Sequence, residues 1–576
     1  MSRGALVCLG HRHWISRHCC PQPRYRTSRQ GNSAPLRSPQ TATAKKRSIW
    51  IDQVCIDQGN STERSQQIQF MNRLYKHAGH VLVWLGSDTE SVAESAFNFV
   101  LELDIIFQDV KRSEGFHVAC TKDLEIQSRK PWVHLDRLMQ LGWFTRGWIV
   151  QEIGTGAPAT LIWGAAEIEW QVLSRVCERL QNYYHLRSKF KIRTDEVRYL
   201  FRRFAEPSER GNNENRYSFI YELHRARRLK FSDQRDRVFA FLGHFSRHGS
   251  NEELRDLKAD YKRTVTEIYN DVAERALRGE AGTSDGSALI TLAAVQHTSL
   301  QTGNAVLSET TVGPSEGDKS PSWVPDWRIF QSFMLTEPVS PHKAHGTSRP
   351  RLEIDDNGSL LRIHGLEIDT IEACSRPLGA GEFYTNSSPG DHEPAITYIW
   401  RDICRQDHFD LGCAYLNGES SFFAYMQTLS NGCVQTAKRD NVQYSKIPKS
   451  RWLEHAASYV VQALGDSDIV VPELREIAEN TDKEHDAEQW SRSANGASEN
   501  RAFARSQKGY YVLGPGVMAA GDVICILFGG KLPFCLRPCG HRYLLVGECY
   551  AHGLMEGEAM RPGGRNELFE RAFEIL

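Results

Sequence analysis

Two short apolar runs separated by an amphipathic segment constrain the fold of this chain most strongly. Residues 49–51 and 81–85 have the composition of buried strands. Apolar side chains recur at helical spacing between them: Ile68, Met71, Leu74 or Tyr75, and Ala78. Asn60 followed by Glu63 has the form of a capping box that starts this helix. A strand, a helix and a strand in this order predict an open α/β domain with a parallel sheet.

The length of the chain predicts several domains, because 576 residues exceed one ordinary core. Residues 352–373 have the pattern of hairpin strands around an Asn-Gly turn. The expected order is a basic disordered tail (1–47), the α/β domain (48–171), a helical extension (172–280), a mixed α/β region with long loops (281–475), a polar linker (476–505) and a small β-rich C-terminal unit (506–576).

Composition and charge exclude several classes of protein. No run of eighteen apolar residues exists, so we expect no membrane span, and fourteen cysteines at this length indicate reduced intracellular thiols. Residues 1–48 hold ten Lys or Arg and no acid, so the remaining chain has a net charge of −11, which argues against nucleic-acid binding. We expect a cytoplasmic protein. The Arg- and Ser-rich start leaves mitochondrial targeting, a disordered tail or a wrongly predicted first exon as readings.

Polar side chains gather where the two predicted strands end. Asp52, Cys55, Asp57 and Gln58 follow the first strand, and Gly-Ser-Asp at 86–88 follows the second. Ligands of open parallel sheets bind beyond the carboxyl ends of the strands, so these loops predict a ligand pocket. The alternative is that the acidic and amide side chains only terminate the backbone at turns and a helix cap.

A second polar cluster lies on a predicted helix at 143–153. Trp148 and Glu152 are four residues apart and share one face, with Arg146 and Gln151 nearby. A carboxylate beside an indole is partly desolvated, which raises its pKa and suits acid–base or cation-stabilising chemistry. The alternative is an ion pair of Arg146 and a glutamate at the helix surface.

Together, the two clusters resemble the fungal heterokaryon-incompatibility (HET) domain. The matching motifs are Trp50-Ile51-Asp52, Cys55-Ile56-Asp57-Gln58, Glu63-Arg64, Gln67 to Met71, Trp84-Leu85-Gly86, and Arg146, Trp148, Gln151 and Glu152. The resemblance continues through FSDQRDRVFAFLG (231–243), Asp260-Tyr261, PSWVPDW (321–327) and the C-terminal GDVICILFGG segment. The strand and helix that usually open the domain are not recognisable before Ile49. The resemblance therefore implies a domain without its usual first strand.

The resemblance implies a role in fungal non-self recognition and programmed cell death, with a fold similar to Toll/interleukin-receptor (TIR) domains. Some TIR domains cleave NAD with a glutamate in a Trp-x-x-x-Glu stretch, and Trp148 to Glu152 has that form. Glu152 is thereby the candidate catalytic residue, NAD is a possible substrate, and no cofactor is required. The candidate pocket residues are Trp50, Asp52, Cys55, Asp57, Gln58, Glu63, Arg64, Arg146, Trp148 and Gln151.

Two other readings stay open: a non-catalytic signalling or assembly module, and an inactive truncated member of the family. In the first, the polar loops form a homotypic surface, so we expect protein partners of an incompatibility system and a possible homo-oligomer. The distinguishing observation is whether Glu152 lies in a cavity shared with Asp52 and Gln58 or faces solvent.

Two groups of thiols are candidates for a metal site or a nucleophile, but neither has the partners that such a site needs. Cys535, Cys539 and His541 form a C-x3-C-x-H cluster without a second ligand pair, so packed thiols are expected rather than a metal site. Cys55 would need a basic partner to act as a nucleophile, and His77 and His80 are near only in sequence.

Overall fold

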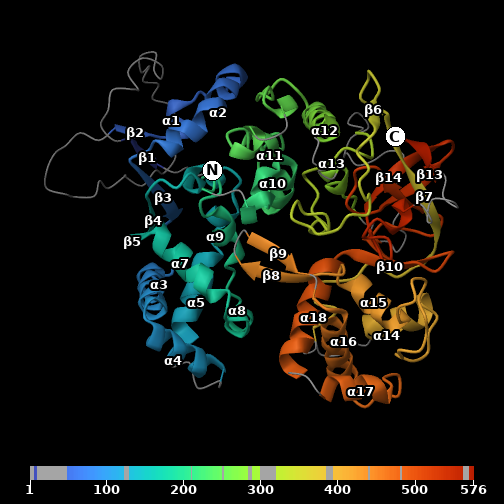
Figure 1. Cartoon of the computed structure of the whole chain (residues 1–576). Coiled ribbons are helices and arrows are strands. Elements are labelled where there is room, and N and C mark those ends of the chain that lie inside the picture. Colours follow the sequence, from blue (N-terminus) through green and yellow to red (C-terminus); the bar gives the residue numbers. More distant parts are fainter. Residues whose placement is uncertain are drawn as a thin grey trace.

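Five strands form the sheet of the N-terminal half of the chain (Figure 1). In the order β2-β1-β3-β4-β5 they are β2 (Ser48–Trp50), β1 (Leu6–Leu9), β3 (His80–Gly86), β4 (Ala159–Trp163) and β5 (Ala166–Glu169). The computed structural model describes residues 6–9, 48–121, 129–208, 211–248, 252–282, 289–298, 320–384, 393–438, 441–445, 447–479, 483–561 and 570–576.

The α/β class is confirmed, but the sheet is mixed instead of parallel. Only β3 and β4 pair in parallel, with Val81 opposite Ala159. Strand β1 lies between β2 and β3 and is antiparallel to both, so β2 and β3 run in the same direction one strand apart. The expectation of no strand before Ile49 is therefore wrong. The rest of the predicted tail lies outside the described residues.

The predicted crossover helix is α2 (Ser61–Lys76), and its start has the expected cap. Asn60 Oδ1 accepts hydrogen bonds from the backbone N–H groups of Thr62 and Glu63, both at 3.1 Å. The helix buries Ile68, Met71 and Tyr75 against the sheet. The other helices of this domain are α1 (Asp52–Cys55), α3 (Ala93–Gln108), α4 (Val110–Thr121), α5 (Arg129–Met139), η1 (Gly142–Thr145) and α6 (Ile149–Gly154).

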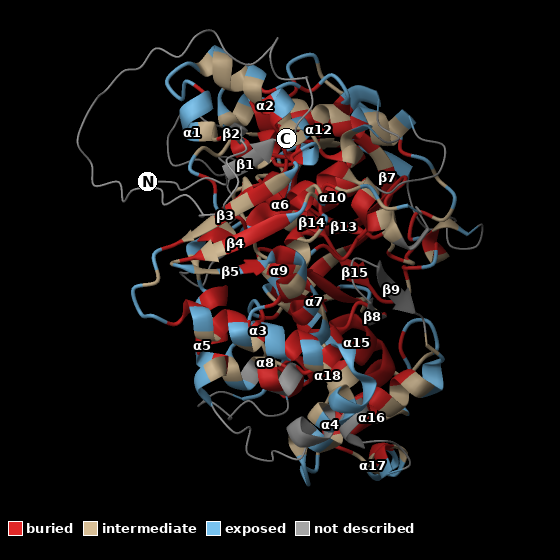
Figure 2. Ribbon diagram, turned by 90° about the vertical axis from the view of Figure 1, so that its left-hand side faces the viewer, coloured by how far each residue is buried: buried red, intermediate tan, exposed pale blue. Residues whose placement is uncertain are grey.

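A helical extension follows the α/β domain. Its elements are α7 (Trp170–Leu180), α8 (Tyr184–Phe190), α9 (Asp195–Leu200), η2 (Gly211–Tyr217), α10 (Phe219–Arg225), η3 (Ala226–Arg228), α11 (Asp236–Phe239), η4 (Phe245–His248), η5 (Glu252–Leu254), α12 (Val265–Gly282) and α13 (Ile290–Ala293). One cluster of buried apolar side chains runs from Trp50 through the extension to Val295 and continues through Trp323 into the barrel strands as far as Ile575. Figure 2 shows this buried material through the middle of the molecule.

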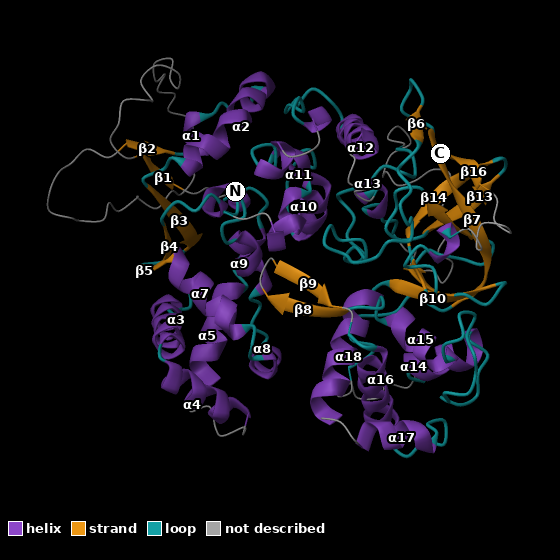
Figure 3. Cartoon of the chain, viewed as in Figure 1, coloured by secondary structure: helices purple, strands orange, loops and turns teal. Residues whose placement is uncertain are grey.

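The C-terminal β-rich unit is a closed barrel (Figure 3). Strands β12 (Val523–Leu527), β13 (Phe534–Cys539), β14 (Arg542–Glu548), β16 (Glu570–Ile575) and β7 (Leu361–Cys374) pair in this order, and β7 pairs back with β12. Strand β7 also pairs with β10 (Arg501–Ser506) and β6 (Leu352–Ile354), and β11 (Tyr511–Pro515) joins β10 to β15 (Tyr550–Ala551). The β6–β7 pair confirms the predicted hairpin.

Helices and a hairpin are inserted between β7 and β10. They are α14 (Ala395–Tyr398), η6 (Ile399–Ile403), α15 (Ser421–Leu429), β8 (Val434–Lys438), β9 (Asn441–Ser445), α16 (Lys449–Leu464), α17 (Pro472–Glu479) and α18 (Lys483–Ser498), and η7 (Glu558–Met560) lies farther on. The predicted polar linker at 476–505 is therefore wrong. Ala487, Trp490 and Ala494 of α18 are fully buried, and the charged side chains that suggested a linker include the solvent-facing Glu488–Arg492 pair. Among the described helices, none is long and apolar enough to cross a membrane.

Candidate functional site

The polar side chains after β2 hold the shape of their own turn. Asp52 accepts a hydrogen bond from the backbone of Gln53 (2.8 Å), and its carbonyl accepts one from the Gln58 amide (3.2 Å). Asp57 accepts one from the backbone of Gly59 (3.0 Å), and Glu63 returns to accept one from the backbone of Asp57 (3.2 Å). These contacts have the form of the turn-and-cap alternative.

The polar loop after β3 also serves a helix terminus. Asp88 accepts hydrogen bonds from the backbone N–H groups of Val92 (3.0 Å) and Ala93 (2.9 Å), at the start of α3. Gly164, after β4, lies so close that a Cβ there would be 2.7 Å from Asp88 Cβ. The loops share one edge of the sheet, as expected, but Asp88 is occupied by capping.

Glu152 lies in the interior of the molecule, with 2% of its surface exposed. Its neighbourhood includes Tyr75 of α2, which is also buried. Burial, followed by the negative charges of Glu152 and Asp52, raises the pKa of Tyr75, and the Arg146 charge opposes this. The edge of Tyr75 meets the Trp50 ring at 5.9 Å.

Four predicted residues, Trp50, Asp52, Arg146 and Glu152, are thus near one another around a tyrosine that the sequence prediction missed. The helical spacing identified Tyr75 only as a core position. Because Glu152 is buried, it does not face solvent, so the surface alternative for this side chain does not hold.

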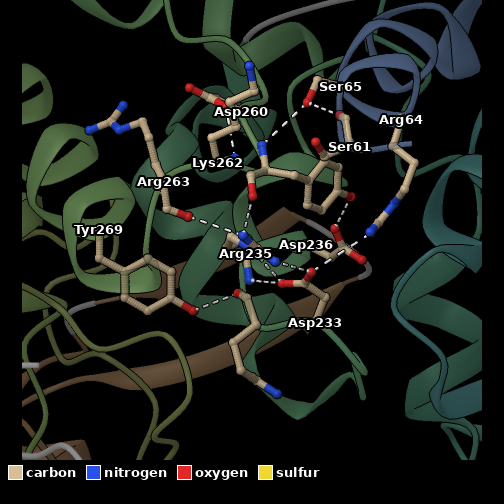
Figure 4. A network of polar contacts seen from close by, with 12 residues as sticks. Ser61, Arg64, Ser65, Asp233, Arg235, Asp236, Asp260, Lys262, Arg263 and Tyr269 are labelled. Carbon is tan, nitrogen blue, oxygen red and sulfur yellow. Dashed lines mark hydrogen bonds and ion pairs between the residues drawn. The ribbon is translucent and has the colours of Figure 1, made fainter. Parts of the chain in front are cut away.

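The other signature side chains contact the helical extension, and Figure 4 shows this for Arg64. A guanidinium nitrogen of Arg64 is 3.8 Å from an Asp233 carboxylate oxygen, and the guanidinium carbon is 3.8 Å from the centre of the Tyr261 ring. Trp148 Nε1 donates to Asp236 (3.0 Å), and the Gln151 amide donates to the carbonyl of Ala240 (2.7 Å). We call these contacts, with those of Ser65, Asn72 and Gly147 below, the α2–α11 interface.

Asp236 is the central acid of the α2–α11 interface. Its two carboxylate oxygens accept from different parts of the chain: Trp148 Nε1 of the α/β domain and the Tyr261 hydroxyl of the extension. Burial raises the pKa of Asp236 to about 6, although both hydrogen bonds favour the charged form. A single carboxylate therefore joins the two motifs.

Asp233 and Arg235 form a hydrogen-bond network beside Asp236. Arg235 donates to both oxygens of Asp233, at 2.9 and 2.8 Å, and to the carbonyls of Tyr261 (2.6 Å) and Arg263 (3.1 Å). Burial would raise the pKa of Asp233, but the hydrogen bonds from Arg235 outweigh it and lower the pKa. The Ser65 hydroxyl accepts a hydrogen bond from the backbone N–H of Tyr261 (3.3 Å), which connects this network to α2.

Two glycines permit the backbones to approach closely. A Cβ at Gly147 would be 2.0 Å from the Phe231 ring, and one at Gly243 would be 2.4 Å from Asn72 Cβ. Gly147 also donates to the carbonyl of Lys230 (2.9 Å), and the Asn72 amide donates to the carbonyl of Gly243 (2.6 Å). The motifs at 63–72 and 146–151 therefore meet the motif at 231–243, which no spacing in the sequence indicates.

The two candidate thiols, Cys535 and Cys55, lie in surroundings typical of structural cysteines. Cys535 is fully buried in the barrel, with its sulfur 3.5 Å from that of Met518. Cys55 is exposed, whereas His77 bonds to the carbonyl of Arg73 and His80 to the Thr160 hydroxyl. Across the described ranges, no group of three His, Cys, Asp or Glu residues is placed to hold a metal ion.

Comparison with known proteins agrees with these motifs. Residues 35–152 match the family described as heterokaryon incompatibility protein (HET), and residues 475–570 match the Het-6 beta-barrel domain. A relative from Neurospora crassa, heterokaryon incompatibility protein 6, OR allele, is 22% identical over 613 aligned positions, which cover 90% of this chain and 82% of the relative. No solved structure matches.

The two family matches fall on the two largest sheets of the structure. The HET match covers the mixed sheet from β2 to β3 and ends at Glu152, and the Het-6 match covers α18 and the barrel strands β10 to β14. The chain is therefore similar to the heterokaryon incompatibility (HET) family at residues 35–152 and to the Het-6 β-barrel domain at residues 475–570.

Proposed function

We propose that this chain acts in fungal non-self recognition and programmed cell death, and that its HET domain passes the signal through protein contacts. The family supports the incompatibility role. The α2–α11 interface supports contact-based signalling, because Arg64, Trp148 and Gln151 bind the extension and do not surround an open ligand site.

The continuous core has a further implication for this role. The HET domain and the extension bury their apolar side chains in one cluster, so they move and signal as one body. What this body presents to partners is its exposed surface, including the turn at 53–55 and 57–59. Its partner in an incompatibility reaction would be a protein that reads that surface.

The proposal is tested by expressing the full chain at a high level in a filamentous fungus. Cell death is counted with a vital dye, and the cellular NAD pool is measured in the same cultures. We expect death with the NAD pool unchanged before viability falls, and equal death from Glu152→Gln at equal protein level. The exposed Glu167→Gln on β5 is the matched control. Absence of death from folded, abundant protein would contradict the proposed role.

TIR-like NAD cleavage is the second candidate, and one observation favours it. Glu152 is a buried carboxylate beside Tyr75, with Asp52 close enough to act on the same tyrosine. Glycosidic cleavage needs such a desolvated carboxylate. With Glu152 2% exposed, however, a substrate as large as NAD could reach it only after α6 or a neighbour moves.

The same cultures distinguish the candidates. A fall in NAD that precedes death and disappears in Glu152→Gln, but not in Glu167→Gln, would replace contact signalling by catalysis. Thermal unfolding of the purified variants shows whether the Glu152→Gln substitution has only destabilised the fold.

A further inference from the structure

Two neighbouring basic side chains of the helical extension, His224 and Arg227, are buried in the core. Their exposed fractions are 0% and 3%. His224 is in the last turn of α10 and Arg227 follows three residues later in η3, a spacing that brings the two side chains together. Among the described residues, neither nitrogen of the His224 ring nor Nε of Arg227 has a hydrogen-bond partner. Polar atoms at this depth are almost always hydrogen-bonded, so this cluster of nitrogen atoms is unusual.

The two side chains converge on one short segment of the chain. The centre of the His224 ring is 6.1 Å from the centre of the Phe330 ring. The Arg227 guanidinium donates to Gln296 Oε1 (3.2 Å), and the same oxygen accepts from the backbone N–H of Gln331 (2.9 Å). His224 and Arg227 therefore approach the same place in the core, one from α10 and the other from η3.

The charge of Arg227 has no carboxylate bound to it. The two groups that accept from its guanidinium are neutral: Gln296 Oε1 and the carbonyl of Ala294 (2.7 Å). The acid whose charge acts most on Arg227 is Asp326, but Arg328 binds both oxygens of that acid, at 2.9 and 2.8 Å. Burial lowers the pKa of Arg227 to about 9. A buried charge of this kind is costly unless an opposite charge compensates it.

The His224 ring supplies a hydrogen-bond donor in the same electropositive place. Burial, followed by the charges of Arg227 and Arg501, lowers the pKa of His224 well below its ordinary value, so the ring is neutral and carries one N–H. The four charged groups that act most on this ring are all arginines. A water molecule could accept from these donors, but only an anion would also compensate the buried charge.

A small cavity against the same segment indicates the size of the ligand. Its volume is about 20 Å³, and its lining includes Gln296, Gln331, Ser332 and Arg501. This is room for one group the size of a water molecule. Glu548 also lines the cavity, but its charge is paired with Arg501 at 3.3 Å. A halide ion is comparable to water in size, whereas phosphate and organic acids are several times larger.

We propose that a chloride ion binds in the core beside Nε of Arg227 and the ring N–H of His224. The ion accepts a hydrogen bond from each group and compensates the guanidinium charge. It thereby stabilises the contact of α10 and η3 with the segment that contains Phe330 and Gln331. This inference does not depend on the proposed signalling role.

Chloride binding to the purified full chain tests the proposal in two ways: broadening of the chlorine NMR resonance, and the melting temperature in sodium chloride against sodium methanesulfonate at constant ionic strength. We expect broadening that bromide reverses, and a melting temperature that rises with chloride and then saturates. Arg227→Met should lose both effects. Arg228→Met, which removes an exposed arginine from the same turn, is the matched control and should keep both.

A second variant separates loss of the site from loss of folding. His224→Phe keeps an aromatic ring against Tyr221 and Phe330 but removes the N–H, so chloride should bind more weakly while the near-UV circular dichroism is unchanged. The proposal would be overturned by a native chain without chloride-dependent broadening or stabilisation. Undiminished chloride binding in either folded variant, or displacement of chloride by phosphate as readily as by bromide, would also overturn it.

Discussion

The free energy of unfolding should depend on pH through Asp236, and the sign of the dependence follows from its burial. The pKa of this carboxyl is about 6 in the folded chain, against an ordinary value of 3.8. The folded state therefore holds a proton between pH 4 and 6 that the unfolded state has released. By linkage, the contribution of Asp236 to stability is greatest below pH 4, falls as pH rises through 6, and is constant above that. The difference of about two pKa units corresponds to about 3 kcal/mol.

Asp236→Asn removes this dependence while keeping the shape of the side chain. The amide oxygen can still accept from Trp148 Nε1, and the amide nitrogen can donate to the Tyr261 hydroxyl, the two groups that now bind the carboxylate. Relative to the native chain, the free energy of unfolding of the variant should therefore rise by up to about 3 kcal/mol as the pH increases from 4 to 7. Most of this rise should be complete by pH 6. The groups facing Asp236 that also carry charge are Asp233 and Arg64.

The assay is urea unfolding of both proteins at half-unit steps from pH 4 to 7.5, reported as the difference between them. Other titrating groups cancel in that difference. Asp233→Asn is the matched control, because the pKa of Asp233 is lowered and its stabilising contribution is lost as pH falls. Because this loss occurs below pH 4, its difference curve should be nearly flat over the measured range. A flat curve for Asp236→Asn over the whole range would refute the assigned role of the buried carboxyl.

Three further predictions concern packing. Gly147→Ala puts a Cβ 2.0 Å from the Phe231 ring and should cost about 1–3 kcal/mol in thermal unfolding, whereas Gly142→Ala, which meets nothing within 4 Å, should not lower the melting temperature. Equal melting temperatures would contradict the tight α2–α11 interface. Trp490→Ala should cost about 3–5 kcal/mol, and the exposed Arg492→Ala about 0.5 or less; a tolerated Trp490→Ala would return α18 to a surface role. Residues 1–171 alone should lack fixed tertiary structure by near-UV circular dichroism, whereas the full chain should have it, since the core is shared; a cooperative transition in the fragment would argue against a shared core.

The local sequence pattern was sufficient to predict the elements that bury one face. Strands β2 and β3 were predicted from apolar runs, and α2 was predicted together with its Asn60 cap, because strand and helix periods and capping are local properties. Strand β1 was missed because four apolar residues in a basic segment give no local signal. Its partners β2 and β3 lie about 40 and 70 residues farther along the chain.

The candidate site shows the same limit. Trp148 and Arg64 were predicted to be pocket residues, since an exposed polar pattern at a strand end is all that the sequence offers. Their actual partners, Asp236, Asp233 and Tyr261, lie between 85 and 200 residues away, and the pairing depends on the tertiary fold. The α18 segment was misjudged for a related reason: its five charged residues outnumber the four apolar ones that it buries.

The position of β7 has a consequence for how the chain is made. This strand pairs with β10, β12 and β16, but these emerge from the ribosome more than a hundred residues after it. The barrel closes only when translation has reached Glu570–Ile575. Until β10 is translated, β6 is the only one of its partners available to this fourteen-residue strand, and most of both edges are unpaired. The nascent chain is therefore most in need of a chaperone while the inserted helices are being translated.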